Sequence, residues 1–225
     1  NTDEPQALVA ELIPNERVPA HYHGVEQFQI FTEGTGKMGR NELGPVTIQY
    51  KDNHTAYGPV LSGDLGLNFY AMRIRTGAEA KPRYAHEPDY REKLRPSKRR
   101  HLICGPVLVS SEVVMEHRKE PVWERVMQGE HDDGLDAHVV RLGAGMEMDG
   151  PDPKRSGGYY LFVIQGDASH EGKLYPRWSM IAVTRTTDAY RMKAGPRGME
   201  ALVLEFPIVT LNAEGHVVLG EAVPA

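Results

Sequence analysis

Residues 18–34 read V-P-A-H-Y-H-G-V-E-Q-F-Q-I-F-T-E-G and decide how the rest of the chain is interpreted. His21 and His23 are two residues apart, and on a β-strand positions i and i+2 project from the same face. The pair therefore has a spacing suited to metal ligands. The alternating apolar residues Phe28 and Ile30 follow, and the stretch ends in glycine, as a strand that leads into a turn does.

The strand face also selects a third ligand. If the strand runs on without a bulge, Gln27, Gln29 and Phe31 share the face of the two histidines. Glu26 then points to the other side, so Gln27 is favoured over Glu26. A bulge at Gly24 would reverse that choice.

This stretch resembles the first motif of the cupin superfamily, G-x5-H-x-H-x3,4-E-x6-G. His21, His23 and Gly34 fall in register with the motif, and Gln27 stands where the family usually has glutamate. The leading glycine of the motif is absent. The resemblance implies a double-stranded β-helix, or jelly-roll, barrel that holds a metal ion.

Composition limits the class of protein. The 225 residues suit one or two domains, and 40% hydrophobic with 25% charged residues is ordinary for a soluble globular protein. No run approaches the roughly 18 apolar residues of a membrane helix, so we expect no membrane partner. A net charge of −5 argues against nucleic-acid binding.

Cysteine usage fits a reducing compartment, and we expect a cytoplasmic protein. Cys104 is the single cysteine, so no intrachain disulfide can form. Its apolar neighbours favour packing as a small buried residue over a role as nucleophile. The chain begins at Asn1 rather than Met, so the sequence leaves open whether a leader was removed.

Short strands dominate the secondary structure that the sequence predicts. The 23 glycines and 16 prolines are scattered throughout, and no segment keeps a helical apolar period over three turns. We therefore predict an all-β fold. The candidate strands cover residues 6–12, 20–32, 46–50, 67–74, 101–109, 138–142, 159–165, 180–184 and 201–206.

An internal repeat divides the chain. G-V-E-Q-F-Q-I-F-T-E-G at residues 24–34 parallels R-S-G-G-Y-Y-L-F-V-I-Q-G at residues 155–166. Two copies of one barrel would explain the length. We predict a bicupin, with tandem jelly-roll barrels over residues 1–104 and 105–225.

Superposition of the two copies predicts that only the first holds a metal. With the closing glycines aligned, the first-copy residues His21, His23 and Gln27 correspond in order to Pro153, Arg155 and Tyr159. None of the second set forms a plausible metal cluster, so the second barrel is expected to lack metal ligands and to serve as a packing partner. An arginine and a tyrosine leave anion binding open there.

Two polar stretches are interpreted as connections. Residues 81–101 hold eight Lys or Arg against three acids and several prolines, which favours a solvated connector. A charged surface patch, or a segment that wraps across a second subunit of a homodimer, is left open. Residues 116–136 are interpreted as a linker or surface loop with one helical turn.

His54, in Y-K-D-N-H-T-A-Y-G-P, is the candidate fourth ligand. The resemblance to cupins implies it, because their second motif carries a histidine on a neighbouring strand. Gly58 stands where that motif usually has asparagine. The alternatives are a surface-turn histidine at this position and a barrel without metal whose histidines are hydrogen-bonded core residues.

The full ligand set of His21, His23, Gln27 and His54 implies one divalent transition metal, and its nitrogen-rich chemistry suits Fe, Ni, Cu or Zn. Because a glutamine replaces the usual carboxylate, the ion would keep a charge of +2, which favours anionic substrates.

Four further residues near these ligands are assigned roles. Glu26 and Tyr57 are candidate general acids or bases, with solvation and outer-surface packing as the alternatives. Gln29 and Phe31 are expected to line the substrate pocket as a polar and an apolar wall.

We therefore predict a metal-dependent cupin enzyme that acts on a small, anionic, metal-chelating organic molecule. An oxygenase is the leading hypothesis. A non-redox isomerase, cyclase or decarboxylase is the second, and a non-catalytic binding cupin is the third.

Overall fold

The chain folds as two compact β units. The computed structural model describes residues 4–76, 80–211 and 217–218. One unit contains the chain up to Val107, together with a short strand pair near the C-terminus, and the other contains Leu108–Ile208. The predicted seam between residues 104 and 105 falls a few residues before this boundary.

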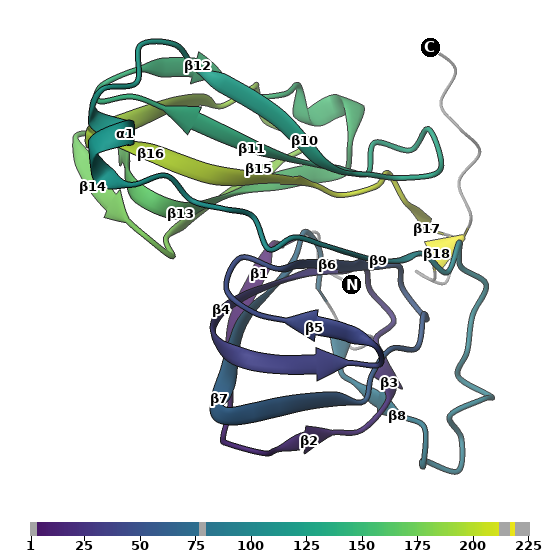
Figure 1. Ribbon diagram of the computed structural model, residues 1–225. Coiled ribbons are helices and arrows are strands. Elements are labelled where there is room, and N and C mark those ends of the chain that lie inside the picture. Colours follow the sequence, from purple (N-terminus) through teal and green to yellow (C-terminus); the bar gives the residue numbers. More distant parts are fainter. Residues whose placement is uncertain (1–3, 77–79, 212–216, 219–225) are drawn as a thin grey trace. The chain divides into compact units, whose positions relative to one another are not determined.

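The first unit is a seven-stranded antiparallel sheet that curls into a barrel (Figure 1). The sheet order is β1-β7-β4-β6-β9, with β2 paired to β7 and β5 to β4, and β3 and β8 form a separate pair. The strands are β1 (Gln6–Leu12), β2 (Arg17–Val18), β3 (His21–Tyr22), β4 (Gln27–Met38), β5 (Asn41–Leu43), β6 (Ile48–Lys51), β7 (Val60–Arg73), β8 (Arg83–Tyr84) and β9 (His101–Cys104).

The second unit repeats this plan. Its sheet order is β10-β11-β16-β13-β14, with β12 paired to β16 and β15 to β13. Its elements are α1 (Glu112–Glu116), β10 (Val122–Gln128), β11 (Asp136–Leu142), β12 (Glu147–Asp149), the 3-10 turn η2 (Pro153–Arg155), β13 (Gly158–His170), β14 (Lys173–Pro176), β15 (Met180–Thr184) and β16 (Arg191–Glu205). The C-terminal pair is β17 (Thr210–Leu211) and β18 (Val217–Val218).

Glycines at the same register fix the repeat. Gly34 on β4 has a φ of +73°, and a Cβ there would lie 2.1 Å from the carbonyl oxygen of Gly66. Gly166 on β13 has a φ of +71°, and its Cβ would lie 2.2 Å from the carbonyl oxygen of Gly198. Each glycine is followed by a register shift in its strand. The predicted alignment of Gly34 with Gly166 is therefore confirmed.

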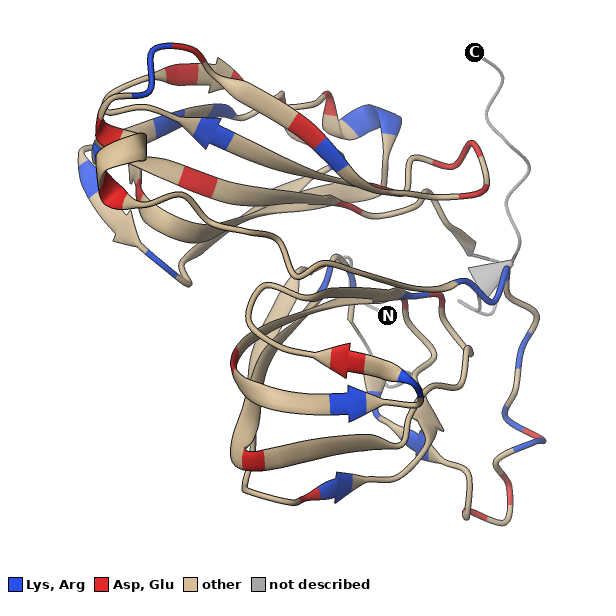
Figure 2. Cartoon of the chain, viewed as in Figure 1, with Lys and Arg blue, Asp and Glu red and all other residues tan. Residues whose placement is uncertain are grey.

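Alternating residues of the long strands build each core. In the first unit Phe31 and Phe69 pack inside the barrel, with ring centroids 5.3 Å apart. In the second unit Val140 and Leu142 of β11 face the core that β13 and β16 complete. Lys, Arg, Asp and Glu lie both along the strands and in the connecting loops (Figure 2). No helix among the described residues is both long enough and apolar enough to cross a bilayer.

The prediction that residues 116–136 form a linker or surface loop is wrong in part. It contains strand β10, which pairs with β11, and the short helix α1 comes just before it. A register shift between Arg125 and Met127 interrupts the alternation of β10, and its polar residues face solvent, so no strand period was visible. The predicted strand at 20–32 is also broken, because the chain leaves regular pairing at residues 23–26.

The two aligned glycines, which have a left-handed backbone, give a stability prediction. Gly34→Ala and Gly166→Ala should each lower the free energy of unfolding by more than the roughly 1–2 kcal/mol that a left-handed conformation costs a residue with a Cβ, because the new methyl group also meets a carbonyl oxygen. Chemical denaturation measures this. Gly44→Ala is the control, since nothing lies within 4 Å of its Cβ position. Equal stability of all three variants would contradict the account.

Candidate functional sites in the two barrels

The first barrel encloses a cavity of about 560 Å³. Its apolar wall comes from alternate residues of β1 and β7, which include Leu8, Leu12 and Phe69. The opposite end is polar and buried. The polar side chains at that end are His21, His23, Gln27, Gln29, Tyr57 and Arg73.

A chain of hydrogen bonds orders this polar end. His21 Nδ1 lies 2.8 Å from the carbonyl oxygen of Pro19, and a carbonyl only accepts, so Nδ1 carries the proton. Nε2 is then an acceptor, and the Tyr57 hydroxyl donates a hydrogen bond to it at 2.8 Å. The amide nitrogens of Gln27 and Gln29 donate to the same hydroxyl oxygen at 3.1 and 3.2 Å. The Tyr57 oxygen is therefore fully hydrogen-bonded.

His23 is held in the same tautomer. Its Nδ1 lies 2.6 Å from the carbonyl oxygen of Ala80, which leaves Nε2 unprotonated. Burial, reinforced by the positive charges of Lys51 and Arg73, lowers the pKa of His23 to about 2. Burial also lowers the pKa of His21. Both imidazoles are neutral, with Nδ1 fixed by a carbonyl, as histidine ligands of metals usually are.

The remaining predicted ligands do not complete a metal centre. Arg73 Nε donates to the Gln27 amide oxygen at 3.1 Å, so that oxygen already serves the guanidinium. The positive charge of Arg73, which disfavours protonation of the imidazoles, also opposes a divalent cation. Among the described residues lining this cavity there is no Asp or Glu. The set at His21, His23 and Gln27 therefore fits a cation poorly.

His54 lies on the other side of the chain from the cavity. Its segment does run beside His23, because the His54 nitrogen donates to the His23 carbonyl at 2.7 Å. The residue has a φ of 52°, and its ring packs on Tyr22 with centroids 5.3 Å apart. Tyr57, three residues later, points into the cavity instead. The structure thus does not bring His54 together with the other three predicted ligands.

Of the other four predicted site residues, two line the cavity and two do not. Tyr57 and Gln29 line the cavity, whereas Phe31 packs behind it against Phe69. Glu26 faces away and forms two hydrogen bonds with the Arg75 guanidinium, at 2.6 and 2.9 Å. Burial alone would raise the pKa of Glu26, but Arg75 more than offsets this and holds it below its ordinary value. This paired carboxylate is not placed to act on a molecule in the cavity.

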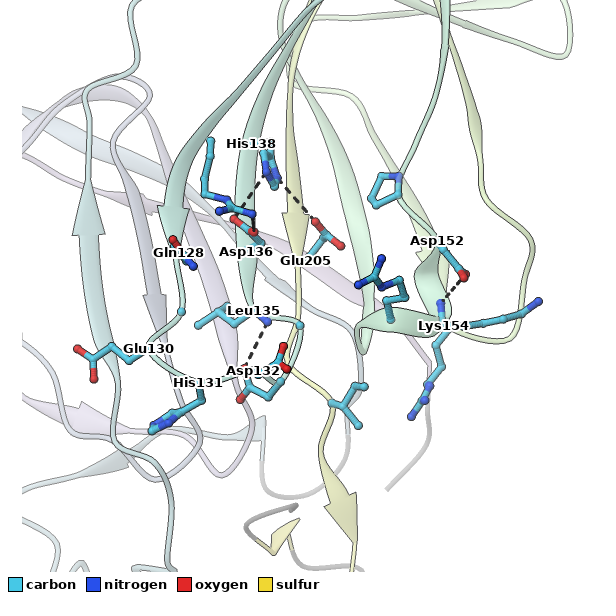
Figure 3. A pocket seen from close by; sticks show the side chains of 18 of the residues that line it. Gln128, Glu130, His131, Asp132, Leu135, Asp136, His138, Asp152, Lys154 and Glu205 are labelled. Carbon is cyan, nitrogen blue, oxygen red and sulfur yellow. Dashed lines mark hydrogen bonds and ion pairs between the residues drawn. The ribbon is translucent and has the colours of Figure 1, made fainter. Parts of the chain in front are cut away.

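The second barrel holds a cluster that sequence reasoning missed. Asp136, His138 and Glu205 each offer a ligand atom within 4.8 Å of the other two, at the edge of a cavity of about 930 Å³. Figure 3 shows the His138 ring between the two carboxylates. Its nitrogens lie 3.8 Å from Asp136 Oδ1 and 3.7 Å from Glu205 Oε2. The two distances involve different ring nitrogens, Nε2 towards Asp136 and Nδ1 towards Glu205, and are too long for hydrogen bonds. The case for a shared cation is that one ligand atom from each residue lies within 4.8 Å of the others.

Strand register makes this cluster unusual. Asp136 of β11 is directly opposite Glu205 of β16, and like charges at opposed positions destabilise an antiparallel pair. Burial, followed by the charge of Asp136, raises the pKa of Glu205 to about 7. Burial lowers the pKa of His138, which keeps that imidazole neutral. Arg125 on β10 contacts Asp136 at 2.9 Å.

The first barrel carries the opposite charge at the corresponding register. There Gln6 of β1 is opposite Arg73 of β7, and the guanidinium donates to the Gln6 amide oxygen at 2.9 Å. The expectation that the second barrel lacks metal ligands is corrected by the candidate cluster there, whose residues lie at positions that do not align with His21, His23 and Gln27. D-A-H at residues 136–138 has the same i, i+2 spacing, and that was the available signal.

Comparisons of the sequence find no relative: no family model and no curated protein matches it. Solved structures do match. The chain superimposes on oxalate decarboxylase from Bacillus subtilis with a TM-score of 0.57 at 10% identity, covering 92% of this chain and 69% of that chain. It superimposes on a salicylate 1,2-dioxygenase from Pseudaminobacter salicylatoxidans with a TM-score of 0.56 at 14% identity, covering 91% and 71%.

A third structure, the cupin 2 conserved barrel domain protein from Leptotrichia buccalis, matches with a TM-score of 0.51 at 10% identity over 92% of this chain and 85% of that chain. The chain has a tandem cupin fold. At such low identity the likeness to these proteins extends to the fold alone.

The buried ion pair beside the first cavity gives a stability prediction. Glu26→Gln leaves the Arg75 charge without its carboxylate at a site where both side chains are almost fully buried, so the free energy of unfolding should fall by about 3–5 kcal/mol. Chemical denaturation measures the loss. Glu42→Gln, which removes an exposed partner of Lys37, is the control and should change little. A Glu26→Gln variant as stable as the control would contradict this role.

Proposed function

We propose that this protein is a metal-dependent cupin enzyme that acts on a small organic acid, and that Asp136, His138 and Glu205 hold the divalent ion. The observation that carries the proposal is the opposed pair of carboxylates with a neutral imidazole between them. A divalent ion would convert their mutual repulsion into attraction, whereas the first barrel holds a fixed guanidinium at the same register.

The chemistry of the donors favours Mn²⁺ or Fe²⁺. Carboxylate oxygens suit hard cations such as Mn²⁺, and imidazole suits Fe²⁺ and its neighbours. Two carboxylates also offset the charge of a divalent ion, which makes its oxidation easier. This is the reverse of the neutral set expected for the first barrel, and it supports an oxygenase as the leading reaction class.

The cavity beside the cluster provides counter-charges for an organic acid. Arg125 and Arg155 line it and lie near enough to Glu205 to act on its ionisation. Trp123 packs on His138 with ring centroids 4.7 Å apart and holds the imidazole in place. When bound, the ion would supply Lewis-acid chemistry at a carboxylate or carbonyl group of the substrate. The arginines would orient that group, and the tryptophan would shield it from water.

Metal binding tests the assignment of the ligands. Protein freed of metal with a chelator should bind one Mn²⁺ in titration calorimetry. Asp136→Asn, His138→Ala and Glu205→Gln should each weaken this binding by more than about 100-fold. Loss of a ligand should cost more than loss of the group that hydrogen-bonds to a ligand, which costs about 10–100-fold in metal affinity. His131→Ala, in the same cavity but outside the cluster, is the matched control and should bind normally.

The same titration separates the two barrels. His21→Ala should leave the affinity for Mn²⁺ unchanged. If His21→Ala abolished binding and Glu205→Gln did not, the ion would belong to the first barrel, and the proposed function would have to be rebuilt on His21, His23 and Gln27.

Oxygen uptake tests the reaction class. Protein loaded with Fe²⁺ or Mn²⁺ should consume oxygen with at least one member of a panel of hydroxy acids, dicarboxylates and β-diketones, as measured with an oxygen electrode, and Arg155→Gln should raise KM more than it lowers kcat. Turnover of a panel member to carbon dioxide or an isomer without oxygen uptake would instead assign a non-redox reaction.

A further inference from the structure

The cavity of the first barrel has its own chemistry, which is independent of the proposed metal centre. It lies within the first unit, and none of its lining residues belongs to the cluster of the second unit. A ligand of this cavity has to complement a polar end whose side chains have fixed protonation states, and a wall that is apolar.

The hydrogen-bond chain leaves one buried acceptor without a partner in the described part of the chain, on a residue that lines the cavity. The Tyr57 hydroxyl donates its hydrogen bond to His21, so it can only accept from Gln29. The Gln29 amide must therefore turn its nitrogen towards Tyr57. The Gln29 side-chain oxygen then has no hydrogen-bond partner among the described residues, although Gln29 is only 4% exposed. A buried acceptor without a partner is costly, so a ligand with a hydrogen-bond donor would be favoured at this point.

The charge at the polar end selects an anion. The charged side chains among the described lining residues are Arg73 and Lys81, and none is acidic. Lys51 is buried with its side-chain nitrogen 5.6 Å from the centre of the Tyr57 ring, and burial lowers its pKa well below the ordinary value, so the positive charge at this end is that of Arg73. The two nearby carboxylates, Glu26 and Asp52, each pair with an arginine. A negative group on the ligand would meet a positive potential here.

The remaining surface of the cavity is apolar. Leu8, Leu12 and Phe69 face it from β1 and β7, so a ligand that fills it needs a hydrocarbon body as well as polar groups. The volume of about 560 Å³ lies in the range of small-molecule sites.

We propose that the first barrel binds a small hydroxycarboxylic acid with an apolar body, without a metal ion. Its carboxylate lies towards Arg73, its hydroxyl donates to the Gln29 amide oxygen, and its hydrocarbon part packs against β1 and β7. The barrel that most resembles a metal-binding cupin in sequence is thus an organic-anion site.

Calorimetry with three matched probes tests this assignment on the full chain, freed of metal. Mandelate has the carboxylate, the hydroxyl and an apolar ring, phenylacetate lacks the hydroxyl, and mandelamide lacks the charge. Mandelate should bind about tenfold more tightly than each of the other two, since each lacks one polar interaction. Failure of mandelate to bind at millimolar concentration, or equal binding of all three probes, would overturn the proposal.

Two variants locate the probe. Gln29→Leu should remove the preference for mandelate over phenylacetate while phenylacetate still binds, so retained phenylacetate binding also shows that the variant is folded. Arg73→Gln should remove the preference over mandelamide, and Arg73→Lys should retain part of it. His131→Ala, in the other cavity, should leave mandelate binding unchanged.

The outcomes separate this proposal from the metal centre. Loss of mandelate binding in Arg155→Gln, with Gln29→Leu unaffected, would place the acid in the second barrel and overturn the inference. Mandelate binding that becomes tight only after Mn²⁺ is added to the metal-free protein would overturn the inference as well. The first of these results does not depend on whether Asp136, His138 and Glu205 bind Mn²⁺.

Discussion

The hydrogen bonds that meet at the Tyr57 hydroxyl constrain everything else in the first barrel. The Pro19 carbonyl fixes the His21 tautomer, and the Tyr57 hydroxyl donates its hydrogen bond to His21. The two glutamine amides must then donate to the Tyr57 oxygen through their nitrogens. These hydrogen bonds occupy the place where a cation would have to bridge His21 and Gln27. The Gln27 oxygen accepts from Arg73, and the Gln29 oxygen has no partner among the described residues.

The two barrels show how one fold supports sites of opposite charge. Both place inward-facing residues of two paired strands at the same end of the barrel. The Gln6–Arg73 pair in one and the Asp136–Glu205 pair in the other differ only in side-chain chemistry at a shared register. If both proposals hold, a change of a few residues at this position exchanges an anion site for a cation site in the same fold.

Much of the fold could be predicted from the sequence, because strand periodicity and glycine turns are local signals. The bounds of β1 and β15, the alignment of Gly34 with Gly166 and the shared face of Gln27 and Gln29 all follow from them. Contacts between distant segments could not be predicted. The left-handed backbone at His54 turns its ring away.

The pairing of Asp136 with Glu205 depends on a register that only the folded sheet defines. The bulge in β10 likewise hid a strand that supplies Trp123 and Arg125 to the second cavity. Local chemistry thus identified the barrels, whereas tertiary register decided which of them suits a metal.

The most direct measurement is the anomalous diffraction of crystals soaked in Mn²⁺ and recorded at the manganese absorption edge. The account predicts a peak within coordination distance of Asp136, His138 and Glu205, and none between His21 and His23, where Tyr57 keeps its hydrogen bonds. A peak bound by His21 and His23, with Tyr57 displaced and the cluster of the second barrel empty, would contradict it.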